Sequence, residues 1–468
     1  MNHHSTSSKL QRSATVPTTR TLSARCRFGF CRFVLGVSLG FGLWGLGFHA
    51  GAQPTTGTYP IDLPTALRLA GAQNLDIQIA RERLAEAEAN HASAVAQFFP
   101  WLAPGAVYRR HENRIQAVDG SIFDADKQSY TVGGAVTAQV DLGDAIYKSL
   151  AAKQLVKAAD HALDAQRQDA TLAAAQGYFE LAFAHASVDV ATEAVRISSD
   201  YETQVERAVE AGIAFKGDQL RVRVQTQRDQ LALRQAAELQ RVVAARLAQT
   251  LHLDPVVELA ASDARLVPLS LVTTNRTLDA LVREAHVSRP ELRQIHSLVA
   301  AANDAKNGAV YGPLVPSLGA QAFVGGLGGG KNSDTGNFGG QEDYFIGLGW
   351  RIGPGGLFDL SRKRAAESRL QGTRLTEEKL RDEISRQVVE AFARLQSSAD
   401  QIDTAKRALT AAEEALRLAR TRKEYAVGVV LETIQAEQDL TRARLDYLKA
   451  VTEFNKAQYA VNKAIGKL

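Results

Sequence analysis

The 468-residue chain has no cysteine after residue 31, because Cys26 and Cys31 are its only two. A segment without thiols forms neither disulfide bonds nor cysteine metal sites, which excludes the disulfide-stapled and zinc-finger classes. After residue 52 the chain also lacks any apolar run that approaches the roughly 20 residues of a membrane-spanning helix. If this part of the chain crosses a bilayer, it must therefore cross as β-strands.

Residues 1–52 have the composition of a secretory signal peptide. They contain basic residues but no acidic residue, then the apolar run of residues 33–48, and they end in Ala50-Gly51-Ala52, a small-residue cleavage site. A membrane anchor is the alternative, but the apolar run is shorter than the roughly 20 residues that such a helix needs. We therefore predict that residues 1–52 are a signal peptide.

Removal of this segment would change the charge balance. Six of the 55 Lys and Arg residues lie in it, which leaves 49 basic against 51 acidic residues, a net charge near −2. A basic nucleic-acid-binding surface is therefore not expected. The histidines are scattered, and no nucleophile, base and acid occur in a recognisable pattern. The sequence thus predicts no enzyme, metal site, cofactor or nucleic-acid partner.

The chain repeats its own pattern at a nearly constant spacing. Ala66-Leu67 returns as Ala280-Leu281, 214 residues later, and Gly212 returns as Gly428, 216 residues later. A period of this length exceeds the 20–50 residues of solenoid units and indicates a duplicated half-molecule. We predict a first structural repeat at residues 53–263 and a second at residues 264–468, with the same layout.

Each half begins with a stretch rich in Ala, Glu, Arg and Gln that ends near a proline. These stretches, residues 63–98 and 278–310, each predict a helix. A much longer stretch follows later in each half, residues 145–211 and 357–427, with one glycine and no proline. Each could form a helix on the order of 100 Å long.

A glycine turn follows each long stretch, at Gly212 and Gly428, and a second helix is predicted after it, over residues 218–251 and 432–465. Glycine is the usual residue for the left-handed conformation that ends a helix. Helices of this length exceed what one globular core can cover, so we expect them to pack as coiled coils.

Between its short and long helical stretches, each half has apolar residues that alternate with small or polar residues. The alternation is clearest over residues 130–142 and 344–353 and weaker over residues 101–108 and 318–324. This predicts one hairpin per half, with strands about ten residues long, the length of a tilted membrane strand. Glycine-rich residues 325–340 predict a flexible polar loop at the second hairpin tip. Aromatic residues gather near the strand ends, as in an interfacial girdle: Trp101, Tyr108, Tyr130, Tyr344 and Trp350.

Four strands cannot close a membrane barrel, since the smallest closed barrels have about eight. Open sheet edges are not tolerated in lipid, and cyclic symmetry would supply the missing strands. The predicted fold class is therefore mainly α with a membrane β-barrel. Long antiparallel coiled-coil helical hairpins combine with four β-strands per chain, which complete a 12-stranded barrel in a trimer.

The order helix, β-hairpin, long helix, glycine turn and helix, given twice, resembles the TolC-like outer-membrane efflux proteins. The resemblance covers residues 60–466, and besides the prolines before each hairpin it is carried by Asn74-Leu75-Asp76, by Arg289-Pro290-Glu291 and by the closing text from Leu431. It implies a homotrimer with a β-barrel in the outer membrane and a helical tunnel in the periplasm. It also implies two partners, a periplasmic adaptor protein and an inner-membrane transporter.

The resemblance further implies site residues. In that family the tips of the helical hairpins dock the adaptor, and acidic residues after the second tip ring the periplasmic entrance, where they would attract cations. Glu432 lies only four residues after its glycine, against six for Asp218, so the choice of gate acid stays open. The matching tip residues are Ala211, Gly212, Ile213, Val427, Gly428 and Val429, and the candidate gate acids are Asp218 and Glu432, with Glu437 and Asp439 as alternatives.

The predicted function is a passive exit duct of a tripartite efflux or secretion system, gated at its periplasmic end. Drugs, metals, peptides and proteins all stay open as substrates. The alternative is an exported coiled-coil scaffold without a pore.

Gly325 to Lys331 nearly match a phosphate-binding loop, but Asn332 stands where Ser or Thr is needed and no helix is predicted to follow. Nucleotide binding is therefore not predicted.

Overall fold

The computed structural model describes residues 59–262, 266–272, 276–332, 334–424 and 429–468. The predicted signal peptide lies outside these residues. So do the predicted boundary between residues 263 and 264 and the tip residues Val427 and Gly428. Among the helices of the described residues, none is both long and apolar enough to cross a membrane.

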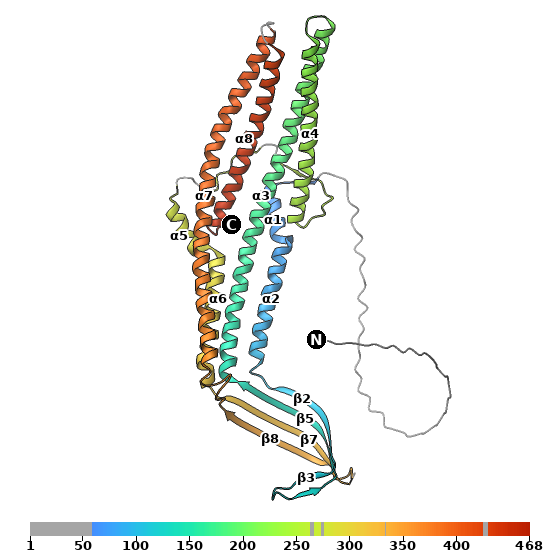
Figure 1. The fold of residues 1–468 in the computed structure, drawn as a ribbon, viewed down its shortest axis with the longest axis vertical. Coiled ribbons are helices and arrows are strands. Elements are labelled where there is room, and N and C mark those ends of the chain that lie inside the picture. The colour runs from blue at the N-terminus through green and yellow to red at the C-terminus, as the bar shows by residue number, and fades with distance from the viewer. Residues whose placement is uncertain (1–58, 263–265, 273–275, 333, 425–428) are drawn as a thin grey trace, which may run out of the picture. The chain divides into compact units, whose positions relative to one another are not determined.

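Apart from β3, β4 and η1, two series of elements with the same order make up the described chain (Figure 1). The first comprises β1 (Tyr59–Ile61), α1 (Leu63–Gln73), α2 (Leu75–Ala96), β2 (Trp101–His111), β3 (Arg114–Gln116), β4 (Ile122–Asp124), β5 (Lys127–Asp141), α3 (Leu142–Glu210) and α4 (Lys216–Thr250). The second comprises β6 (Leu259–Ala261), α5 (Leu278–Ser288), α6 (Pro290–Tyr311), the short 3-10 helix η1 (Gly312–Leu314), β7 (Ser317–Lys331), β8 (Gly339–Gly349), α7 (Leu360–Glu424) and α8 (Val430–Ala464).

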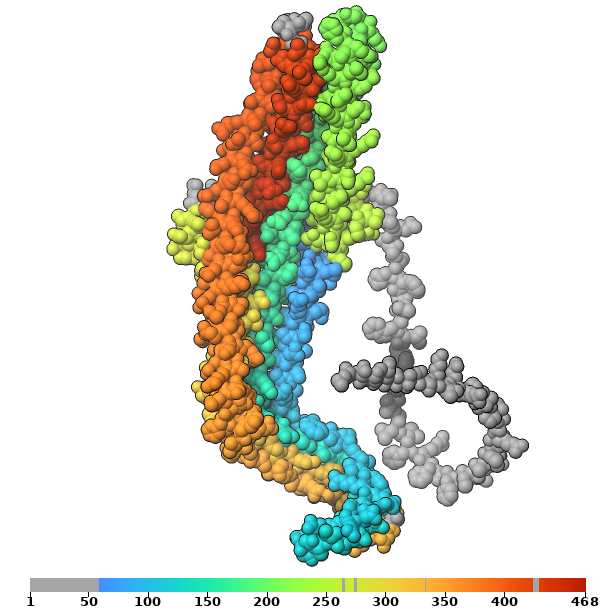
Figure 2. Space-filling model, viewed as in Figure 1, coloured from blue at the N-terminus to red at the C-terminus, as the bar shows by residue number. Residues whose placement is uncertain are grey.

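Two long helical hairpins dominate the fold, α3 with α4 and α7 with α8. The helix α3 has 69 residues and α7 has 65. The hairpins lie side by side (Figure 2), and α8 contacts both α3 and α4. Small residues allow close packing: a Cβ added at Gly177 of α3 would lie 3.1 Å from the Leu247 side chain of α4. The predicted long helices, glycine turn and returning helices are confirmed for the described residues.

Two hydrophobic cores lie where the short helices pack against the long ones. The first joins α1 to α3 and α4 and includes Ile61, Tyr178 and Leu247. The second joins α5 and α6 to α7 and α8 and includes Leu281 and Ile384. Each core therefore fixes a short helix against one long hairpin.

The prediction of one unbroken helix before each β-hairpin is wrong. Residues 63–98 divide into α1 and α2 at Asn74, and residues 278–310 divide into α5 and α6 at Arg289. Asn74 caps α2, because its Oδ1 accepts hydrogen bonds from the backbone N–H groups of Asp76 and Ile77. Its amide also donates to the carbonyl oxygen of Thr250 at 3.0 Å, at the end of α4.

Arg289 makes the equivalent connection in the second series, where it is 2% exposed. Its guanidinium donates to the carbonyl oxygen of Lys463 at 3.1 Å, at the end of α8, and to Gln387 Oε1 of α7 at 3.0 Å. It also pairs with Glu291 at 2.9 Å. The break in each short helix is thus tied to the end of a distant long helix.

The strands form a four-stranded antiparallel sheet in the order β2-β5-β7-β8 within the described residues. The sheet continues from the end of the bundle opposite the hairpin tips (Figure 1). The predicted strand over residues 344–353 ends earlier, at Gly349. Two further pairs occur: β3 with β4, and β1 with β6 in parallel. The strand β6 lies between the two long helical hairpins in the sequence.

The prediction of a flexible loop over residues 325–340 is wrong for its glycine run, because residues 325–331 belong to β7 and residues 339–340 to β8. Aromatic rings take the space that side chains on these glycines would occupy. A Cβ at Gly328 would lie 2.5 Å from the Tyr130 ring, and one at Gly326 would lie 2.1 Å from the Phe338 ring. The rings of Tyr130 and Phe338 stack at 5.8 Å. Glycine in these strands is thus covered by aromatic packing, which stabilises the sheet.

Replacing Arg289 by Ala should destabilise the fold by about 3 kcal/mol, because Glu291 and two helix-end carbonyls would lose a buried charged partner. The measurement is the free energy of unfolding of the detergent-solubilised protein, followed by circular dichroism. The matched control is Arg293→Ala in the exposed first turn of α6, which should change that free energy by less than about 0.5 kcal/mol. Equal losses for the two variants would contradict the role given to Arg289.

Candidate functional site

The two faces of the sheet differ in polarity. On β5 and β7, one face carries Val132, Val136 and Leu318, whereas the opposite face carries Thr137 and Gln321. The pairing register puts Leu102, Val136, Ala322 and Tyr344 in one row, and on the other face Thr137 and Gln321 lie between Trp101 and Phe345. One face therefore suits lipid and the other suits water.

Both edge strands of the sheet, β2 and β8, lack a partner along their outer sides in the described residues. The predicted aromatic girdle is largely exposed, with Trp101, Tyr108, Tyr344 and Trp350 each more than half accessible. Tyr130 is the exception, since its ring packs on Phe338. The sheet of the described residues thus combines exposed apolar side chains with two unpaired edges.

The first hairpin tip is a glycine-terminated helix end. Gly212 has φ +74°, and the backbone N–H of Ile213 donates to the carbonyl oxygen of Ala208 at 2.8 Å. The N–H of Gly212 donates to the carbonyl oxygen of Val209 at 3.0 Å, which completes a Schellman motif. Ile213 and Phe215 are each 82% exposed. The tip therefore presents apolar side chains on a rigid turn.

In the second tip the structure describes only Val429 of the three predicted residues, and Val429 is 65% exposed. Glu432 lies in the first turn of α8, and Asp218 lies in the first turn of α4. Glu432 pairs across the hairpin with Arg422 of α7 at 2.8 Å, whereas Asp218 pairs within its own helix with Arg221 at 3.1 Å. These two acids occupy equivalent positions in the two hairpins.

Glu437 differs from the other two candidate acids because it lies between helices. Its side chain is 12% exposed, and it lies 3.5 Å from Arg420 of α7. Burial raises the pKa of Glu437, and Asp229 of α4 raises it further, while Arg420 offsets part of the effect. Burial likewise raises the pKa of Asp229, whose carboxylate accepts a hydrogen bond from Gln225 at 2.8 Å. Asp439 is exposed on α8.

A cation–π contact and a hydrogen bond connect the two hairpins near their tips. Lys423 Nζ of α7 lies 3.6 Å from the ring centroid of Tyr201 of α3, a cation–π arrangement. Burial lowers the pKa of Lys423 and raises that of Tyr201 to about 12. Gln438 of α8 donates to Gln225 of α4 at 2.6 Å. We call these four residues the inter-hairpin seam.

Sequence reasoning did not find the seam residues or Phe215. A lysine and a tyrosine 222 positions apart carry no local signal that they meet. Phe215 could have been found, since it is an aromatic residue in the turn that the glycine predicted.

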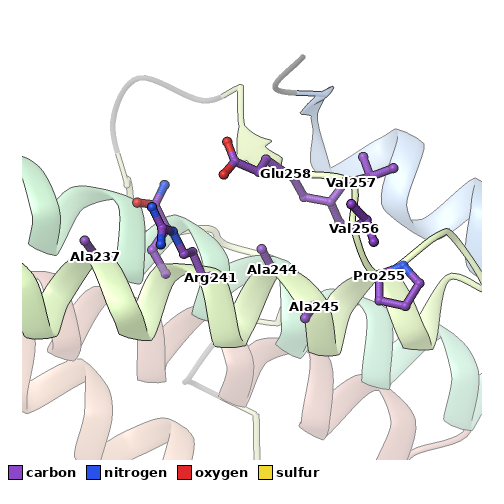
Figure 3. A pocket seen from close by; sticks show the side chains of 10 residues that line it. Ala237, Arg241, Ala244, Ala245, Pro255, Val256, Val257 and Glu258 are labelled. Carbon is purple, nitrogen blue, oxygen red and sulfur yellow. The ribbon is translucent and has the colours of Figure 1, made fainter. Parts of the chain in front are cut away.

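The described residues also contain a cavity of about 340 Å³ between α4 and the segment before β6. Figure 3 shows that its wall is formed largely by small and apolar side chains, with Arg241 and Glu258 as the charged residues. These lining residues include no nucleophile with a neighbouring base, so the cavity offers no catalytic set. Within the described residues, no group of three His, Cys, Asp or Glu side chains could hold a metal ion.

Comparison with known proteins agrees with this geometry. The model of the outer membrane efflux protein family matches residues 66–251 and 281–467. A search of curated proteins found no match.

Several solved structures have a similar fold. The CmeC outer membrane channel of Campylobacter jejuni has a TM-score of 0.76 at 15% identity, over 86% of this chain and 85% of that chain. The outer membrane protein VceC of Vibrio cholerae has a TM-score of 0.71 at 18% identity, over 86% and 96%. The MtrE channel of Neisseria gonorrhoeae, solved in its open state, has a TM-score of 0.68 at 19% identity, over 86% and 88%. Together with the family match, they show that the chain belongs to the outer membrane efflux protein family, and that it is an outer-membrane channel protein with a periplasmic helical part, not an enzyme.

Proposed function

We propose that three copies of this chain form the exit duct of a tripartite efflux system. The observation that carries the proposal is the four-stranded sheet with one apolar face and two open edges. In lipid such edges must pair, and β2 of one copy would pair with β8 of the next. Three copies give a closed barrel of twelve strands, within the size range of membrane barrels.

The helical hairpin tips would be the docking points of a periplasmic adaptor protein. Ile213 and Phe215 are largely exposed at the first tip, and Val429 is exposed at the second. Exposed apolar residues that cluster on a fixed turn are typical of a protein-binding surface. An inner-membrane transporter would supply the energy, because a passive duct performs no chemistry of its own.

The gate would lie at the same end of the helices. The Glu432–Arg422 pair connects α8 to α7 beside the second tip, and the inter-hairpin seam connects that hairpin to the first. Opening would change the packing between the hairpins, with adaptor contacts favouring one arrangement. A secretion duct for proteins would use the same parts, so the substrate class is not part of the proposal. A pore-free scaffold is disfavoured by the apolar sheet face, which a scaffold would leave in water.

Crosslinking tests the barrel directly, because no cysteine follows residue 31. A chain that carries both Val107→Cys on β2 and Gln341→Cys on β8 should give covalent trimers with a short bis-maleimide on a denaturing gel. The single variant Val107→Cys is the control and should give no trimer. Wild-type protein should also conduct ions in planar bilayers. A monodisperse monomer in detergent, or bilayers without channels, would refute the proposal.

Replacing the candidate gate acids should weaken the helix contacts at the hairpin tips and so favour the open channel. In the double variant Asp218→Ala/Glu432→Ala, two partly exposed ion pairs are lost, each stabilising by about 0.2–1 kcal/mol. The open fraction in planar bilayers should therefore rise about 1.4- to fivefold per pair. The control is Glu413→Ala, an exposed acid on α7, which should leave conductance unchanged. An unchanged double variant would rule out the gating role.

The buried acid Glu437 makes the helical packing depend on pH. Since its pKa in the folded protein is raised, its favourable contribution is present below its ordinary pKa and is lost as pH rises through the raised value. Glu437→Gln should therefore raise the midpoint of thermal unfolding at pH 8 and have little effect at pH 4. The exposed Glu413→Gln on α7 should show no such difference. A lower midpoint at pH 8 for Glu437→Gln would contradict the assignment.

A further inference from the structure

A row of basic residues crosses the sheet at the end farthest from the helices. His111 of β2 lies directly opposite Lys127 of β5, and Lys127 lies directly opposite Lys331 of β7. Since β5 runs from Lys127 to Asp141, where α3 begins, this row is at the far end of the strands. Arg109 lies two residues inward on the same face, opposite Ser129. Like charges in directly opposed positions destabilise a sheet, so packing alone does not explain the row.

The nearby acids of the described residues contact other groups. Glu112 pairs with Arg110, which is on the opposite face of β2. Asp126 accepts a hydrogen bond from the backbone N–H of Asn113 at 3.2 Å. Asp334 accepts one from the backbone N–H of Gly336 at 2.8 Å.

The three permanently charged members of the group, Arg109, Lys127 and Lys331, are exposed. Among the described residues, none of them has a carboxylate within salt-bridge distance; the one ion pair on this part of the sheet is that of Arg110 with Glu112. Their charge therefore acts on the solvent that the face contacts.

The strand register decides which face that is. Lys127 shares its face of β5 with Ser129, Thr131, Thr137 and Gln139, whereas the opposite face carries Val132, Val136 and Val140. The apolar face suits lipid, so the basic face borders the lumen of the barrel. This step rests on the proposed trimeric channel. Deeper on the same face of the sheet lie two acids, Asp343 of β8 and Asp141 at the helix end of β5, so the three basic residues outnumber them.

We infer that Arg109, Lys127 and Lys331 form a basic collar at the external end of the lumen, which attracts solutes that carry phosphate or carboxylate groups. Threefold symmetry would bring three such sets to one ring, and rings of charged side chains set the ion selectivity of pores. The wall of the barrel confines the field within the lumen and raises the local concentration of anions. The collar thus favours anionic cargo at the exit, opposite in sign to the candidate gate acids.

The test is the reversal potential across a planar bilayer of zwitterionic phosphatidylcholine in a KCl gradient. In the triple variant Arg109→Gln/Lys127→Gln/Lys331→Gln the cation-to-anion permeability ratio should rise about two- to fivefold. The difference should shrink at 1 M salt, where the screening length falls to about 3 Å. Arg110→Gln is the matched control, since it removes one charge from the same strand on the opposite face, and it should leave the ratio unchanged.

A second measurement uses the wild-type protein alone. Tripolyphosphate added on the external side should block the current at a lower concentration than the same anion added on the periplasmic side. Equal block from both sides, or no block, contradicts the collar.

The outcomes separate the collar from the proposed function. If channels form and the triple variant keeps the wild-type ratio, the collar is refuted and the duct stands. If Arg110→Gln changes the ratio as much as the triple variant, the face assignment is wrong. If the difference requires anionic lipid in the bilayer, the basic row binds headgroup phosphates and not solutes in the lumen. If neither protein forms channels, the proposed function fails and the collar fails with it.

Discussion

The backbone groups along β2 and β8 must find hydrogen-bond partners outside their own chain, and the rest of the architecture follows from this constraint. The sheet has an apolar face with Val132, Val136 and Leu318, so it belongs in lipid, where no water can satisfy an open edge. In the proposed channel, pairing with further copies would satisfy these edges. Because β5 continues directly into α3 and α7 is the next element after β8, copies that share a barrel also bring their helical hairpins together. A closed sheet thus implies a closed ring of helices.

The fold was predictable wherever local composition decides it. Long stretches without proline, interrupted at Gly212, predicted the helical hairpins, and strict alternation predicted β5 and β8. Two predictions failed. The helix breaks at Asn74 and Arg289 have local signals, an N-cap asparagine and Pro290, and their side chains also bond to the ends of α4 and α8. The glycines of β7 suggest a loop, but Tyr130 and Phe338 supply the side-chain packing that glycine lacks.

The candidate site was predictable only in part, for a similar reason. The turn at Gly212 has the expected left-handed conformation, because a helix end of this kind leaves a local signature. The spacing from the second glycine turn could not decide whether Glu432 or Glu437 is the gate acid, although the surroundings of the two residues differ. Glu432 is at the tip, whereas Glu437 is buried one and a half turns further along, facing α7 and α4. A long helix that packs on two sides has no single apolar stripe from which the sequence would reveal this.

The two hairpins show how a duplicated framework can carry different electrostatics. Glu206 of α3 lies 3.6 Å from Arg223 of α4, and Arg420 of α7 lies 3.5 Å from Glu437 of α8. The positions correspond at an offset of 214 residues, but the signs are exchanged. The attraction within the pair does not depend on which helix carries the acid. The interaction of each charge with its other neighbours does depend on it. Arg223 also pairs with Glu202 at 2.9 Å, so in the first hairpin one arginine forms ion pairs with two acids. In the second hairpin burial raises the pKa of Glu437, and Asp229 of α4 raises it further. The hairpins therefore share the geometry of this pair, whereas the charges around the pair differ.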